Sequence, residues 1–212
     1  MIHIRSARVV DLPGVAVVLQ EAFSDKMRII FGNAPEKARV LLEAVYTGPV
    51  QRGYDGVIVA EQDGRIVGTL VVEPIFHTQQ ENRLVENLAV RELGLPRALR
   101  AAFLLWLFSH QPESGEAYIS DVGVAPDCQG AGIGQWLMEH AEEWALDHNR
   151  TRLALWVAES NSRAIHVYER AGYTVTRTRS SLLTRLAFGI RHWYFMEKPL
   201  IDEAGTGFDA EP

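Results

Sequence analysis

The sequence predicts an α/β fold with one central mixed β-sheet flanked by helices. Strand-like and helix-like segments alternate from residue 116 onward, which favours parallel strands in that half of the chain. Two apolar runs joined by Asp63-Gly64 predict a hairpin, which adds antiparallel strands. The 212 residues are 47% hydrophobic and 23% charged, which suits a single globular domain over residues 1–201. The acidic segment 202–212 is expected to be a disordered tail.

The elements of the first half follow from periodicity and turn residues. We expect, in order, a strand at 2–5, a helix at 11–23, a helix at 35–45 that ends before Gly48-Pro49, and strands at 56–60 and 65–72. Residues 75–95 are polar and carry no clear assignment.

The segment 96–110 predicts a helix that is apolar on nearly every side. Because such a helix must be covered all round, we favour burial beneath the sheet. The alternative is that its apolar surface forms a homodimer interface or one wall of a substrate site.

The second half predicts alternating strands and helices. We expect a strand at 116–124, a glycine-rich turn at 126–134, a helix at 133–148, a strand at 152–157, a helix at 161–171 closed by Gly172, and strands at 173–179 and 192–200 separated by a loop or short helix.

Composition narrows the classes of function. A single cysteine, Cys128, excludes an intrachain disulfide and a cysteine-based zinc site, and fits a reducing cytosol; no metal centre is expected. The longest apolar run, 101–108, is too short to span a membrane, and the N-terminus has no secretory apolar region. We therefore expect a cytoplasmic protein without a membrane segment. The net charge of −6 includes no dominant basic patch, so nucleic-acid binding is not expected.

Residues 120–134 carry the most informative pattern. A predicted strand leads into a turn containing Gly130, Gly132 and Gly134, and a helix begins there. Glycines allow close approach of the backbone, and the first N–H groups of a helix can bind a phosphate. The spacing matches neither a P-loop nor a dinucleotide-binding fingerprint. A glycine-rich turn that binds no ligand remains the alternative for the glycines alone.

Two motifs in order resemble the GCN5-related N-acetyltransferases. Gln129-Gly-Ala-Gly-Ile-Gly is similar to the family's acetyl-CoA signature, and Asn161, Ala164 and Tyr168 followed by Glu169-Arg-Ala-Gly-Tyr are similar to its second motif. The resemblance covers residues 2–200 and is least typical over 75–115. It implies an enzyme that moves an acetyl group from acetyl-CoA directly to a primary amine of a small molecule or protein, in a ternary complex. A non-catalytic acyl-CoA-binding module or sensor on the same fold is the alternative.

The resemblance also implies which residues bind acetyl-CoA. Pyrophosphate would lie on the amides after Gln129, namely those of Gly130, Ala131, Gly132, Ile133 and Gly134. The pantetheine arm would run along Val122 and Val124, and the Val122 N–H would donate a hydrogen bond to the oxyanion. Asn161 would hydrogen-bond to the pantetheine arm or serve only as a helix cap. The three-residue step from Ile119 to Val122, followed by a two-residue step to Val124, predicts a β-bulge.

The catalytic residues are assigned less directly. By resemblance Tyr168 would be the general acid for the CoA thiolate, although a plain core tyrosine fits the same spacing. The glutamate that histone-type members use as base corresponds to Tyr118 here, so we choose the neighbouring Asp121. Asp121 could equally be a solvated surface residue, and an ordered water could replace a dedicated base. The other candidates for the base are Glu73, His77 and Glu86.

Two charge patterns bear on the ligands. The family often carries a basic residue inside the loop, and this chain has Gly130 and Ala131 there. Arg163 or Arg170 could compensate, although simple solvation is the interpretation that we favour for both. The acidic balance of residues 111–160 is compatible with a cationic amine acceptor.

Overall fold

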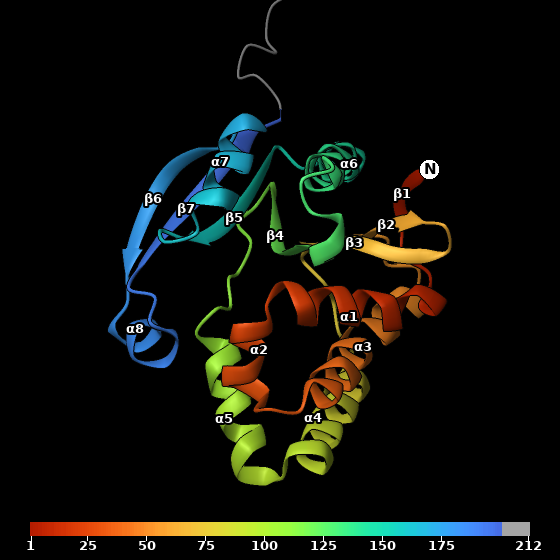
Figure 1. Cartoon of the computed structure of the whole chain (residues 1–212), viewed down its shortest axis with the longest axis vertical. Coiled ribbons are helices and arrows are strands. Elements are labelled where there is room, and N and C mark those ends of the chain that lie inside the picture. The colour runs from red at the N-terminus through yellow and green to blue at the C-terminus, as the bar shows by residue number, and fades with distance from the viewer. Residues whose placement is uncertain (201–212) are drawn as a thin grey trace, which may run out of the picture.

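A seven-stranded mixed sheet forms the centre of the computed structural model, which describes residues 1–200 (Figure 1). The predicted disordered tail at 202–212 lies outside the described residues. In chain order the elements are β1 (Ile2–Ser6), α1 (Leu12–Ala22), α2 (Ser24–Phe31), α3 (Pro35–Gln51), β2 (Val57–Gln62), β3 (Arg65–Glu73), α4 (Gln79–Leu93), α5 (Leu95–Trp106), β4 (Glu116–Val124), α6 (Ile133–Asp147), β5 (Arg152–Ala158), α7 (Ser162–Arg170), β6 (Thr174–Ser180), α8 (Leu182–Phe188) and β7 (His192–Pro199). The predicted α/β class with a mixed sheet is confirmed.

The strand order, β1-β2-β3-β4-β5-β7-β6, corrects one expectation about the second half. β4 and β5 are parallel neighbours as predicted, but β7 lies between β5 and β6 and is antiparallel to both. Burial gives the reason. Phe195 and Met196 of β7 are fully buried, whereas every residue of β6 is exposed. The more apolar strand therefore takes the inner position and leaves β6 at the edge.

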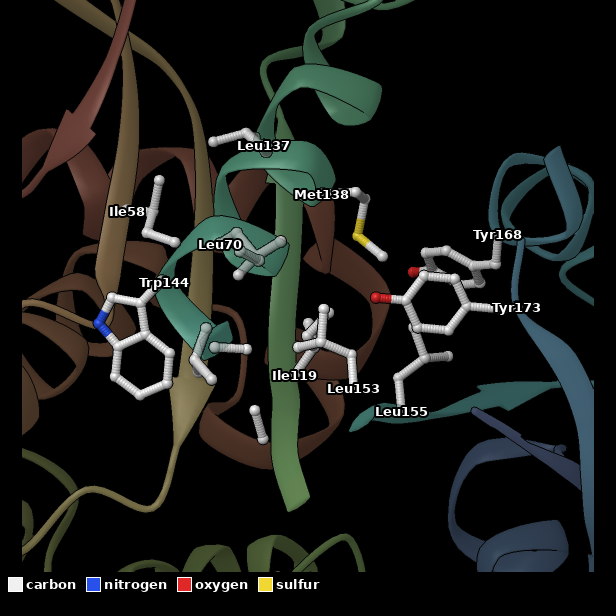
Figure 2. Packing of buried hydrophobic residues seen from close by; sticks show 14 of the residues in the cluster. Ile58, Leu70, Ile119, Leu137, Met138, Trp144, Leu153, Leu155, Tyr168 and Tyr173 are labelled. Atoms are coloured by element: carbon white, nitrogen blue, oxygen red, sulfur yellow. The ribbon is translucent and has the colours of Figure 1, made fainter. Parts of the chain in front are cut away.

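Helices cover the two faces of the sheet differently. α6 packs over β2, β3 and β4 on one face, and α1 with α3 covers the other (Figure 1). Figure 2 shows Leu137, Met138 and Trp144 of α6 lying over residues of the strands. A Cβ atom at Gly68 of β3 would lie 2.9 Å from the Ile133 side chain. This glycine therefore lets the beginning of α6 pack directly on the sheet.

The helix predicted at 96–110 is observed as α5, but it is not buried beneath the sheet. α5 packs against α2 and α4, and these helices form a lobe that extends away from the sheet (Figure 1). Only Ala98, Ala101 and Leu104 of α5 are buried, whereas Leu99 and Trp106 are 62% and 64% exposed. The prediction was wrong because neighbouring helices cover one side of α5 only.

One further helix prediction needs correction, and one segment without an assignment proves to be a helix. α3 continues through Gly48-Pro49 to Gln51, although a proline in a helix interior costs about 3 kcal/mol. Burial of Tyr46 and Val50 against the sheet offsets this cost. α4, in the segment left unassigned, begins with a capping box formed by Thr78 and Glu81. Within residues 1–200, no helix combines the length and apolarity needed to cross a bilayer.

Candidate active site

A β-bulge divides β4 at the position that the spacing predicted. Val72 pairs with Ile119 and Val71 pairs with Asp121, so Ser120 is an extra residue with no partner on β3. The side chains after the bulge therefore change face relative to a regular strand. The predicted bulge is confirmed.

The bulge sorts the side chains of β4 between two environments. Ile119, Val122 and Val124 pack into the core beneath α6. Asp121 faces the opposite side, where it accepts a hydrogen bond of 3.4 Å from the Tyr46 hydroxyl of α3. The apolar residues expected to line a ligand and the carboxylate expected to act as base thus lie on opposite faces of one strand.

β4 and β5 separate shortly after they begin. They pair only from Glu116–Arg152 to Tyr118–Ala154, although β4 continues to Val124 and β5 to Ala158 (Figure 1). Backbone N–H and C=O groups on these facing edges need hydrogen-bond partners, and an extended ligand can supply them as an added strand would.

The loop between β4 and α6 presents backbone N–H groups. Gly130 and Gly132 adopt φ values of +85° and +82°, a conformation that other residues rarely take. Among the described residues, no backbone acceptor pairs with the amides of 129–134, and the next amide, that of Gln135, donates to the Gly132 carbonyl at 3.0 Å. The Ile133 side chain is buried in the core, at the first residue of α6. This arrangement at the start of a 15-residue helix suits an anion.

Side chains from two other elements reach this loop. Gln129 donates to the Val124 carbonyl at 3.3 Å, and Arg163 of α7 donates to the Gln129 side chain at 2.9 Å. Arg163 is exposed to solvent, as we favoured, and its hydrogen bond to Gln129 also brings a positive charge beside the loop. The sequence did not indicate Arg65 of β3, which forms a two-point ion pair with Asp127.

Asn161 and Tyr168 lie at opposite ends of α7. Asn161 caps the helix, because its Oδ1 accepts the Ala164 amide at 3.2 Å. Tyr168 is 8% exposed, and burial raises the pKa of its hydroxyl to about 12, so it remains a donor at neutral pH. Figure 2 shows the hydroxyls of Tyr168 and Tyr173 both directed towards Met138. Within residues 1–200 the buried Tyr173 hydroxyl has no hydrogen-bond partner.

Two carboxylates lie on the other face of the sheet. Glu73 pairs across the strands with Tyr118, the position that aligns with the family's glutamate. Burial raises the pKa of Glu73 to about 7, and the charge of Asp121 adds to this effect. Burial also raises the pKa of Asp121, while Lys26 and the Tyr46 hydroxyl oppose that shift. A carboxylate that titrates near neutral pH is suited to general-base work, so among the candidates that the sequence offered the structure favours Glu73 alongside Asp121.

The remaining candidates have different surroundings. Glu86 is exposed on α4, and His77 is half-buried before α4, with burial and Arg52 lowering its pKa. Among residues 1–200, no three His, Cys, Asp or Glu side chains are grouped in a way that could hold a metal ion.

Comparisons with known proteins agree on one family. The model of the acetyltransferase (GNAT) family matches residues 19–173. Streptothricin acetyltransferase of Streptomyces lavendulae is 37% identical over 81 residues, which are 38% of this chain and 43% of that protein. A mycothiol acetyltransferase of Geodermatophilus obscurus is 27% identical over 187 residues, which are 77% of this chain and 58% of that protein. The chain thus spans about half the length of these curated relatives.

A solved structure gives the corresponding result for the fold. The ribosomal-protein-S18-alanine N-acetyltransferase from Escherichia coli superposes with a TM-score of 0.57 at 17% identity, covering 98% of this chain and 99% of that one. At this identity the likeness concerns the fold, including the seven-stranded mixed sheet.

Proposed function

The chain belongs to the GNAT family of acetyltransferases, as its motifs predicted, and from this premise we propose that it is an acetyl-CoA-dependent N-acetyltransferase. The acetyl group would pass directly to a primary amine in a ternary complex. One observation carries the proposal: where β4 and β5 separate, free loop amides and Tyr168 lie on one side of the sheet, and Glu73 and Asp121 lie on the other. In a direct transfer the two substrates must meet at one point, and this arrangement would let each reach that point from its own side of the sheet.

The residues present fit acetyl-CoA on the donor side. The unpaired amides of Gly130, Ala131, Gly132, Ile133 and Gly134 would hold the pyrophosphate, with Arg163 adding charge. The edge of β4 at Val122 and Val124 would bind the pantetheine arm, and the Val122 N–H would stabilise the developing oxyanion. Asn161 keeps its amide NH₂ as a donor towards the same arm. Acetyl-CoA, when bound, supplies the activated thioester.

Proton movement completes the chemistry. The N–C bond forms as the C–S bond breaks. An amine that arrives protonated must lose two protons, one before it attacks the thioester and one afterwards, and the leaving sulfur must gain one. Glu73, whose pKa burial raises to about 7, would take one amine proton, and Asp121 would serve as the acceptor of the second. Tyr168 donates its hydroxyl proton to the leaving thiolate, because burial keeps that hydroxyl protonated.

The acceptor class follows from the surroundings of the carboxylates and from the relatives. Related proteins are named for streptothricin, mycothiol and a ribosomal protein, so small-molecule and protein acceptors both occur among them. The acidic pair Glu73 and Asp121 favours an acceptor that arrives as a cation.

Incubation with acetyl-CoA and a broad panel of amines tests the proposal, with acetylated products measured by mass spectrometry. We expect the product to form faster than the uncatalysed rate. Tyr168→Phe, compared at equal occupancy by acetyl-CoA, is the control and should form the product more slowly. Acetyl-CoA binding without any product would favour the non-catalytic module. No binding of acetyl-CoA would refute the assignment of the loop at 129–134.

A further inference from the structure

The ammonium group of Lys26, on α2, lies among three aromatic rings. Its Nζ is 5.0 Å from the centroid of Phe23, 5.4 Å from that of Phe108 and 5.6 Å from that of Trp193. These rings come from the end of α1, the segment after α5 and the beginning of β7. All three distances are within the roughly 6 Å over which an aromatic face attracts a cation. We call Phe23, Phe108 and Trp193 the aromatic cage.

Lys26 fills this cage without polar contacts. Among residues 1–200, its Nζ forms no hydrogen bond and no ion pair, although an ammonium carries three N–H donors. Burial lowers the pKa of Lys26, and the charge of Asp121 only partly opposes this. Burial of an ammonium without hydrogen-bond acceptors opposes its charged form, so the aromatic faces are its main attraction within the cage.

Two of the three walls, Phe108 and Trp193, are held in place independently of Lys26. The Trp193 Nε1 donates to Thr184 Oγ1 at 3.0 Å, and Trp193 is 6% exposed. Phe108 packs edge-on against Phe188 at 4.7 Å and against Trp193 at 5.4 Å. Lys26, in contrast, has a long side chain with four rotatable bonds. Its departure would leave a formed site behind.

The position of the cage links it to the carboxylates. Trp193 pairs with Ala158, at the end of β5 that has separated from β4. Asp121, on the facing part of β4, is close enough for its charge to affect Lys26. The cage therefore lies near Asp121, on the face of the sheet that we assign to the acceptor.

We propose that the aromatic cage is the subsite for the protonated aliphatic amine of the acceptor, and that Lys26 is a displaceable internal occupant which competes with it. The role of the cage in catalysis rests on the proposed function, whereas binding of an ammonium group in the cage does not. An incoming ammonium would displace Lys26, keep the attraction of the three rings, and lie near Asp121 for removal of a proton.

Direct binding of n-butylammonium to the full chain, without acetyl-CoA, tests the proposal. Isothermal titration compares the natural protein with Lys26→Ala, which empties the cage, and with Lys26→Arg, which keeps a cation in it. We expect Lys26→Ala to bind n-butylammonium about tenfold more tightly than the other two proteins, and 1-butanol to show no such gain. Adding Phe108→Leu to Lys26→Ala should weaken binding by about threefold or more.

Three results would overturn the proposal. They are an unchanged affinity in Lys26→Ala, equal gains for n-butylammonium and 1-butanol, and binding of butanoate by the natural protein that Lys26→Ala loses. The last would make Lys26 an anchor for a carboxylate. Lys26→Ser serves as a second variant if Lys26→Ala does not fold, as judged by circular dichroism. This titration measures no acetyl transfer, so a negative result would not contradict the proposed function. If acetyl transfer were not observed, binding of n-butylammonium to the cage could still be measured.

Discussion

Replacing Glu73 by Gln tests whether burial raises the pKa of the carboxylate at the end of β3 to near neutral pH. Burial raises the pKa of Glu73 from 4.5 to about 7. Between these values the folded protein holds a proton that the unfolded chain has lost, so stability falls as pH rises and the loss is complete above about pH 8. The shift corresponds to about 3 kcal/mol, or about 2 kcal/mol after a discount for solvent screening of a half-buried group.

Urea unfolding, followed by tryptophan fluorescence at pH 5 and pH 8, measures this effect without any knowledge of the acceptor. Glutamine stays neutral at both pH values, so the stability of Glu73→Gln relative to the natural protein should rise by about 2 kcal/mol from pH 5 to pH 8. Glu86→Gln, an exposed glutamate on α4, is the matched control and should show no such rise. Asp121→Asn should move the transition of Glu73 to lower pH, because it removes a neighbouring negative charge.

The same group predicts the pH dependence of activity. Because the base must be ionised, kcat/KM should increase about tenfold from pH 6 to pH 8, and Glu73→Gln should lose this limb of the profile. Identical pH dependence of stability in the natural protein and in Glu73→Gln would refute the reasoning, since it would mean that Glu73 titrates at its ordinary value.

Three other substitutions test the donor side of the site. Tyr168→Phe should lower kcat by about 10²-fold or more while the Kd of acetyl-CoA, measured by isothermal titration, stays within about threefold. Arg163→Ala should raise that Kd several-fold and make it less sensitive to salt, because one positive charge beside the loop is lost; an unchanged Kd would remove Arg163 from the site. Gly132→Ala should lower the unfolding free energy by about 1 kcal/mol or more and weaken binding, because φ at this position is +82°.

Features encoded within a few residues could be predicted from the sequence. Asp63 and Gly64 have φ values of +52° and +80°, as the Asp-Gly hairpin signal requires. The spacing of Ile119, Val122 and Val124 was enough to place the bulge in β4. The capping box of Thr78 and Glu81 was also present in the sequence, and it could have identified α4.

Features that depend on contacts between distant segments could not be predicted in this way. The exposure of α5 depends on which helices pack beside it, and its composition alone suggested burial. Arg163 reaches Gln129 only because α7 docks next to the loop before α6. Glu73 had been one candidate among several, and nothing in its local sequence indicated a pKa near 7.

The sequence by itself determined the family, the mixed α/β class and the strand–turn–helix that presents free amides, because these depend on local backbone preferences and on motif spacing. Only the tertiary structure decided that β7 lies beside β5, that Glu73 joins Asp121, and that three aromatic rings surround Lys26. The physical reason is that strand order, burial and the pKa shifts that follow from burial arise when segments far apart in the chain exclude water together.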